Sequence, residues 1–145
     1  MIVLNKIVVA YDSSEHSKRA LDWALHMSQL SHATIDVVMV LVSSTVSLGY
    51  AGAYAFPGAE RDAAEQEIEM NLLEVQNSCK EKGIKVNTQS LFGNAVKEIL
   101  LYADSSQADM IICGTRGLGS FSGLLLGSVA RALVTYSKVP VMVIK

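Results

Sequence analysis

Ile111-Ile112-Cys113-Gly114-Thr115-Arg116-Gly117, followed after nine residues by Gly127-Ser128-Val129, is the stretch that most constrains the fold of this chain. Its first three residues are apolar and mostly β-branched, a pattern typical of a buried strand. Ser128 is a favourable helix N-cap, and Val129, Leu133 and Tyr136 follow it at helical spacing. The stretch therefore predicts a strand that enters a glycine-rich loop and leaves it at the N-terminus of a helix.

A loop of this kind is suited to bind phosphate. Glycine allows backbone N–H groups to approach a ligand closely, and the start of a helix carries unpaired donors and partial positive charge. Arg116 adds a permanent cation between two loop glycines. The alternative is that the glycines only form turns, which the complete set at fixed offsets disfavours.

Three other loop motifs are excluded by their spelling. A Walker A loop needs Lys followed by Ser or Thr after its last glycine, whereas Gly119 is followed by Ser120 and Phe121. The dinucleotide fingerprint needs glycine at Ser122, and a nucleophile elbow needs serine at Phe121. The predicted phosphate loop therefore belongs to another class.

The length of the chain indicates a single globular domain, because 145 residues suffice for a substantial core. The chain is 50% hydrophobic and 18% charged, which excludes disorder for most of it, and its net charge of −2 without a basic cluster argues against nucleic-acid binding. Cys79 and Cys113 lack metal-ligand spacing, so we expect reduced thiols and a cytoplasmic location. The apolar residues 1–4 are too few for a signal peptide, and no apolar run approaches the ~18 residues of a membrane span.

Strand and helix patterns alternate along the chain. Apolar strands are predicted at residues 7–10, 35–42, 86–91, 110–113 and 139–144. Helices are predicted after a cap at Asp12, Ser13 or Ser14, over residues 60–82, from Asn94 onward and over residues 128–137, with a long loop over 43–59. This rhythm predicts an α/β fold: a doubly wound, Rossmann-like, five-stranded parallel sheet of order 3-2-1-4-5 with helices on both faces.

The predicted topology brings two distant features together. In such sheets a ligand binds at the carboxyl ends of the strands, where the strand order reverses. The strands at 7–10 and 110–113 should be neighbours at that point, which places Asp12 opposite the glycine loop. This convergence predicts a nucleotide site from the residues alone.

The spacing Gly114-x2-Gly117-x9-Gly127-Ser128 closely resembles the ATP-binding loop of the universal stress protein family. Residues 6–17 resemble the family's opening strand and aspartate-led turn, residues 93–99 its glycine turn, and residues 124–129 and 139–144 its last helix and strand. The resemblance implies one nucleotide-binding domain over residues 1–145. Ala95 stands where many members have proline and Ser13 where many have glycine, but neither lies in the phosphate loop.

The resemblance also implies a ligand and its contacts. The ligand would be ATP, or AMP or ADP, with Mg²⁺ or Mn²⁺ held through the phosphates rather than by a protein metal site. Asp12 would lie beside the ribose and base, and Val40 would contact the adenine through its backbone. The phosphates would be surrounded by Gly114, Arg116 and Gly117 on one side and by Gly127, Ser128 and Val129 on the other.

Other conspicuous residues have plain interpretations. His16, His26 and His32 are spaced by ten and six residues, which does not place metal ligands on one helix face, so we expect surface histidines. Trp23 on the first predicted helix is expected to be a packing residue.

Three function classes remain open. The first is an ATP-binding stress-response or regulatory protein that signals through nucleotide occupancy. The second is an enzyme that slowly hydrolyses ATP or activates a substrate with it; no general base is evident, although Asp12 and Glu98 stay open as candidates. The third is a dimeric interaction module without nucleotide, which the intact glycine loop disfavours. We expect the first, with no catalytic residue.

The last strand predicts self-association. Residues 139–144 are apolar and would form a sheet edge, and an exposed apolar edge invites pairing with another chain. A two-fold homodimer through this strand is the simplest way to cover it, and the family resemblance implies the same. The expected partners are thus an adenine nucleotide and a second copy, with neither nucleic acid nor membrane.

Overall fold

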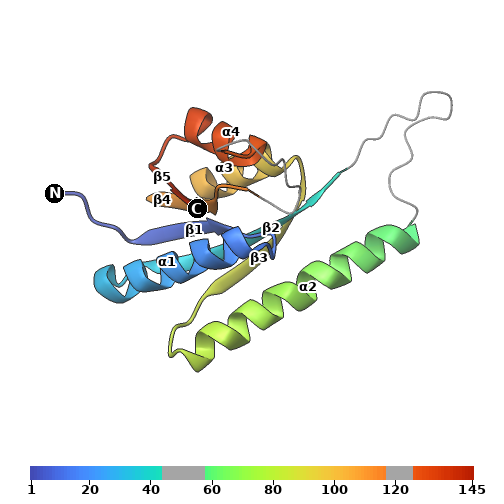
Figure 1. Ribbon diagram of the computed structural model, residues 1–145, viewed down its shortest axis with the longest axis horizontal. Coiled ribbons are helices and arrows are strands. Elements are labelled where there is room, and N and C mark those ends of the chain that lie inside the picture. The colour runs from blue at the N-terminus through green and yellow to red at the C-terminus, as the bar shows by residue number, and fades with distance from the viewer. Residues whose placement is uncertain (44–57, 117–125) are drawn as a thin grey trace.

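The structure is a computed structural model that describes residues 1–43, 58–116 and 126–145. These residues form one parallel sheet of five strands in the order β3-β2-β1-β4-β5 with four helices, which confirms the predicted fold and strand order (Figure 1). In chain order the elements are β1 (Lys6–Ala10), α1 (Glu15–Ser31), β2 (Thr34–Val42), α2 (Gly58–Glu81), β3 (Asn87–Gly93), α3 (Ala95–Ser105), β4 (Met110–Gly114), α4 (Ser128–Tyr136) and β5 (Val141–Ile144).

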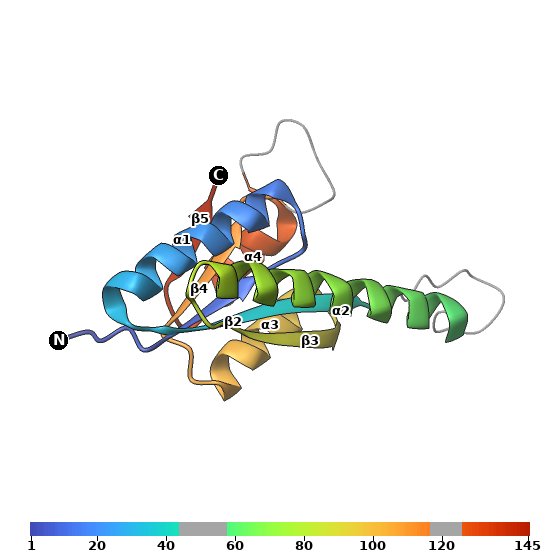
Figure 2. The ribbon, with the colours of Figure 1, turned by 90° about the horizontal axis from the view of Figure 1, so that it is seen from below.

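Helices cover both faces of the sheet, α1 and α2 on one side and α3 and α4 on the other (Figure 2). The central strand β1 contributes to both layers because successive side chains point to opposite faces. Ile7 and Val9 pack under α1 and α2, whereas Val8 packs under α3 and α4, and all three are fully buried. No helix in the described part of the chain is long and apolar enough to span a bilayer.

Strands β1 and β4 are parallel neighbours, as predicted. Ile7, Val8 and Val9 lie opposite Met110, Ile111 and Ile112. Since β2 pairs on the other side of β1, the chain order reverses between β1 and β4. The carboxyl ends of these two strands therefore lie side by side at the switch point of the sheet.

Side-chain caps fix the start of two helices. Ser14, one of the three predicted candidates, caps α1 by accepting the N–H of Ser17 at 3.2 Å. Asn94 caps α3 as predicted and accepts the N–H of Lys97 at 3.0 Å. Helix α2 ends just before Gly83, whose φ of +78° favours glycine. The predicted loop over 43–59 lies almost entirely outside the described residues.

Helix α4 differs from its prediction. Gly127, not Ser128, is the N-cap, and it makes no side-chain cap bond. The Gly127 N–H is bound to the carbonyl of Thr115, and helical geometry begins at Ser128 itself. The buried residues are Ala130 and Leu133, whereas Val129 and Tyr136 of the predicted stripe are exposed.

Trp23 lies at the surface, and the last strand is shorter than its prediction. Trp23 is 50% exposed because the buried face of α1 is formed by Ala20, Leu21, Ala24 and Leu25; its ring meets that of His26 edge-on. Strand β5 is shorter than predicted and begins after Pro140. Its position at the sheet edge is as predicted.

A buried carboxylate lies at the other end of the sheet. Asp36, near the start of β2, is 3% exposed. Its oxygens accept hydrogen bonds from the Tyr102 hydroxyl at 2.9 Å and the Asn87 amide at 3.0 Å, and Lys6 Nζ lies 3.5 Å away. These donors balance the buried charge, and they join β1, β2, β3 and α3.

Candidate functional site

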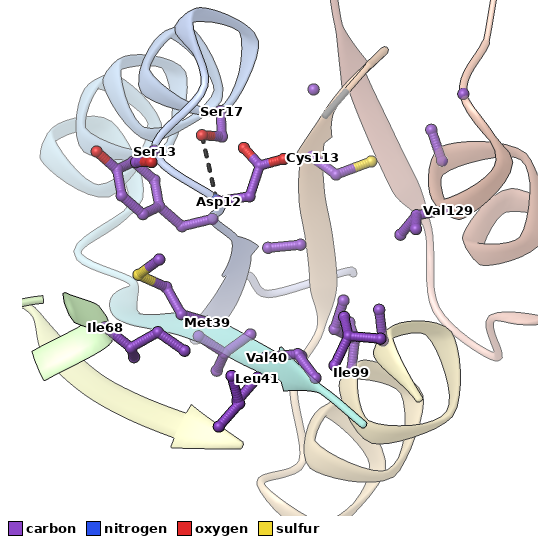
Figure 3. A pocket seen from close by; sticks show the side chains of 18 of the residues that line it. Asp12, Ser13, Ser17, Met39, Val40, Leu41, Ile68, Ile99, Cys113 and Val129 are labelled. Carbon is purple, nitrogen blue, oxygen red and sulfur yellow. Dashed lines mark hydrogen bonds between the residues drawn. The ribbon is translucent and has the colours of Figure 1, made fainter. Parts of the chain in front are cut away.

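A cavity of about 490 Å³ opens at the carboxyl ends of the strands, where β1 and β4 meet (Figure 3). Its walls come from β1, the first turn of α1, β2, α2, α3, β4 and α4. Seven of the eight residues predicted for the site line it: Asp12, Val40, Gly114, Arg116, Gly127, Ser128 and Val129. The eighth, Gly117, lies outside the described residues.

The start of α4 forms one wall of the cavity. The Gly127 N–H donates to the Thr115 carbonyl at 2.6 Å, and the first helical bond runs from Arg131 N to the Gly127 carbonyl. The N–H groups of Ser128, Val129 and Ala130 therefore have no acceptor within the helix. Since these three residues line the cavity, partial positive charge faces it, which favours an anion.

Gly114 has a packing requirement of its own. A Cβ there would lie 2.6 Å from Cβ of His16 and 2.9 Å from its carbonyl carbon, distances that real atoms do not reach. The first turn of α1 thus rests directly on the end of β4. This contact requires glycine at the end of β4 whether or not a ligand binds, a reason distinct from the turn and phosphate roles considered from the sequence.

Asp12 follows β1 in the turn that leads to α1. One carboxylate oxygen accepts the Ser14 N–H at 3.0 Å, and the Asp12 N–H donates to Ser17 Oγ at 3.3 Å. Figure 3 shows the carboxylate pointing toward the end of β4 and Cys113. The turn therefore holds an oriented acceptor group at the switch point.

The rest of the cavity is mainly apolar. Val40 and Leu41 at the end of β2, Ile68 on α2 and Ile99 on α3 line it (Figure 3). Burial raises the pKa of the Cys113 thiol to about 11, so this cysteine is a neutral part of the wall at physiological pH. Burial, with a smaller effect of Glu74, also raises the pKa of Tyr11. An apolar region beside an anion-binding wall suits a ligand with a flat ring and a charged tail.

Several lining residues were not predicted. Thr115 lies inside the glycine motif, and its position there was an available signal. Ala64, Glu67 and Asn71 come from α2, and only tertiary packing brings them to the cavity. In the described part of the chain, no group of three or more His, Cys, Asp or Glu side chains could hold a metal ion.

Solved structures share this fold. Protein MJ0577 superposes with a TM-score of 0.86 at 23% identity, over 99% of this chain and 97% of that one. A universal stress protein in complex with cAMP gives a TM-score of 0.74 at 24% identity, over 99% of both chains. The universal stress protein of Archaeoglobus fulgidus in complex with dAMP gives 0.66 at 21% identity, over the full length of both chains.

Sequence comparison gives the family. Universal stress protein YxiE of Bacillus subtilis is 29% identical over 99% of this chain and 100% of its own length. Universal stress protein MJ0531 of Methanocaldococcus jannaschii is 30% identical over 97% of this chain and 81% of its own length. The model of the universal stress protein family matches residues 4–145. This chain therefore belongs to the universal stress protein family.

Proposed function

We propose that residues 1–145 form one nucleotide-binding domain that takes ATP, or AMP or ADP, into the cavity at the sheet switch point and acts as a regulatory protein through its occupancy. The observation that carries this proposal is the gathering of the seven described candidate residues around a single cavity. Its volume falls within the ~300–1,000 Å³ of ordinary small-molecule sites. Two structural relatives are described as complexes with cAMP and dAMP, which supports an adenine nucleotide as the ligand.

Each part of the cavity has a role in this proposal. The start of α4 and Arg116 bind the phosphates, because both attract anions. The Asp12 carboxylate accepts hydrogen bonds from the ribose hydroxyls, and the apolar wall around Val40 receives the base. Mg²⁺ or Mn²⁺ enters with the phosphates, since such ions commonly keep few protein ligands.

Regulation is favoured over rapid turnover because the two candidate bases are poorly placed. One oxygen of Asp12 is bound within its own turn. Glu98 does not line the cavity; its side chain lies over Gly93, the last residue of β3. We therefore expect ATP turnover far below the ~10 s⁻¹ typical of enzymes. Slow hydrolysis remains the second candidate function, with Asp12 as its base.

The test is direct measurement of the bound nucleotide. Purified protein is denatured and its released nucleotides are separated, and ATP affinity is then measured by calorimetry. Arg116→Gln should weaken ATP binding about tenfold, because a charged hydrogen bond is lost. Arg131→Gln is the matched control, since it removes the same charge from α4 outside the cavity. Equal affinities for both variants, or no nucleotide binding by the wild type, would refute the proposal.

We also propose a homodimer through β5. This strand pairs with β4 on one side only within the described residues, and it forms an edge of the sheet. All four of its residues are half-buried. A second copy that pairs antiparallel with the free side of β5 would complete the sheet across a two-fold axis.

A further inference from the structure

Thr115, the residue after β4, joins four elements. Its N–H donates to the Ile144 carbonyl on β5 at 2.8 Å, and its carbonyl accepts the N–H of Gly127 at the start of α4. Its hydroxyl lies 3.1 Å from Nδ1 of His16 on α1. The residue is 6% exposed and lines the nucleotide cavity. The orientation of Thr115 thus determines where α4 begins relative to β4.

One ring nitrogen of His16 has two polar partners. Nδ1 lies 3.2 Å from Nη2 of Arg19 as well as 3.1 Å from the Thr115 hydroxyl. A guanidinium has donors only, so Nδ1 is the acceptor in its contact with Arg19. The Thr115 hydroxyl then donates to the same nitrogen, and the carbonyl of this residue accepts the Gly127 N–H.

Arg19 anchors this arrangement at its other side. Its Nε donates to the main-chain oxygen of Lys145, just after β5, at 2.8 Å. The imidazole of His16 is therefore held between the end of β5 and the end of β4. The missing side chain of Gly114 makes this possible, because α1 approaches β4 closely enough for His16 to reach Thr115.

We infer that His16 is a positioning residue of the nucleotide site: through Nδ1 it holds Thr115 in the orientation that keeps Gly127 and the first turn of α4 at the phosphate end of the cavity. His16 does not line the cavity, so it acts on the ligand only through Thr115. This inference rests on the proposed function for its effect on ATP, while its geometric part concerns the Thr115–Gly127 bond.

The test compares variants that remove the hydrogen bond with variants that keep it. Thr115→Val removes the hydroxyl and His16→Leu removes the acceptor while keeping the Cβ that packs on Gly114. Each should weaken ATP binding about fivefold to tenfold. Thr115→Ser and His16→Asn retain a donor and an acceptor at these places, so both should bind ATP nearly as the wild type does. Melting temperatures of all four confirm that the comparison is made on folded protein.

A double-mutant cycle gives the decisive result. If His16 acts through Thr115, the double variant Thr115→Val with His16→Leu should bind ATP no more weakly than the worse single variant. The inference would be overturned if the two single losses of ATP affinity add in the double variant. It would also be overturned if Thr115→Ser and His16→Asn lose as much ATP affinity as Thr115→Val and His16→Leu.

Amide hydrogen exchange at Gly127 separates this inference from the proposed function. If the wild type binds no nucleotide, the proposed function fails, but the geometric claim is still decided. Faster exchange of the Gly127 N–H in Thr115→Val and His16→Leu, and not in Thr115→Ser or His16→Asn, would support the positioning role. Unchanged exchange in all variants would overturn it.

Discussion

Replacing Gly114 with alanine tests whether the end of β4 and the first turn of α1 are in direct contact. The new Cβ would lie 2.6 Å from Cβ of His16, 2.9 Å from its carbonyl carbon and 3.1 Å from the backbone nitrogen of Ser17. Two of these three atoms belong to the backbone, so a change of side-chain rotamer cannot relieve the overlap. Helix α1 must move away from β4.

The magnitude follows from two opposing effects. Overpacking of a buried contact costs about 1–3 kcal/mol, whereas alanine restricts the unfolded chain and returns about 0.4–1 kcal/mol. We expect a net loss of about 1–2 kcal/mol in the free energy of unfolding, which corresponds to a melting temperature lower by roughly 3–8 °C. Gly127→Ala is the matched comparison, because φ is −68° there and its Cβ would lie 3.1 Å from the Thr115 carbonyl oxygen. Both variants restrict the unfolded chain equally, so the difference between them reports the packing cost.

Urea unfolding followed by circular dichroism measures the difference, and the order is the prediction. We expect the free energy of unfolding of Gly114→Ala to be lower than that of Gly127→Ala, and that of Gly127→Ala to be close to the wild-type value. If Gly114→Ala is as stable as the wild type, α1 does not rest on β4 as described, and the explanation of this glycine by packing is wrong.

Two further predictions concern the buried carboxylate and the sheet edge. Burial, and then the hydrogen bond to Asp36, raise the pKa of Tyr102 to about 12, so its neutral form is favoured by folding; stability present below pH 10 should fall as the pH rises toward 12. Tyr102→Phe should lower the free energy of unfolding by about 1–2 kcal/mol at pH 7 and reduce its decrease at alkaline pH. Urea unfolding at several pH values measures both effects. A decrease between pH 10 and 12 as steep as in the wild type would contradict the prediction. At β5, bonds to β4 involve the carbonyls of Pro140 and Ile144, so the N–H of Val143 points to the free side. Val143→Pro should shift light-scattering mass from dimer toward the 15.6 kDa chain, whereas Val143→Ala should not; a wild-type monomer would refute the dimer.

The sheet could be predicted because its central strands are mainly apolar. Ile7, Val8 and Val9 have no polar neighbour between them, and this pattern is typical of a parallel strand with helices on both faces of its sheet. The cap at Asn94 was predictable for a similar local reason, since an acceptor side chain before an apolar stripe marks a helix start. Local signals of this kind do not depend on tertiary contacts.

The start of α4 could not be predicted locally. Ser128 is the better capping residue by type, yet the Thr115 carbonyl binds the Gly127 N–H and places the cap at Gly127. Of the predicted stripe only Leu133 is buried; Ala130 is buried with it, whereas Val129 and Tyr136 are exposed. The contribution of α2 to the cavity could not be predicted from the sequence either, since it depends on how α2 packs over β2.

The described members of the glycine motif line the cavity at the switch point, and one of them has a packing requirement in addition to the role predicted for it. Gly114 was assigned to the phosphates, but its first requirement is the contact with His16. That contact brings Nδ1 of His16 to Thr115, and Thr115 in turn holds Gly127 at the start of α4. A glycine needed for packing therefore contributes to the shape of the candidate site through three successive contacts. Substitution of Gly114 should consequently affect nucleotide affinity as well as stability, even with an alanine too small to reach the ligand itself.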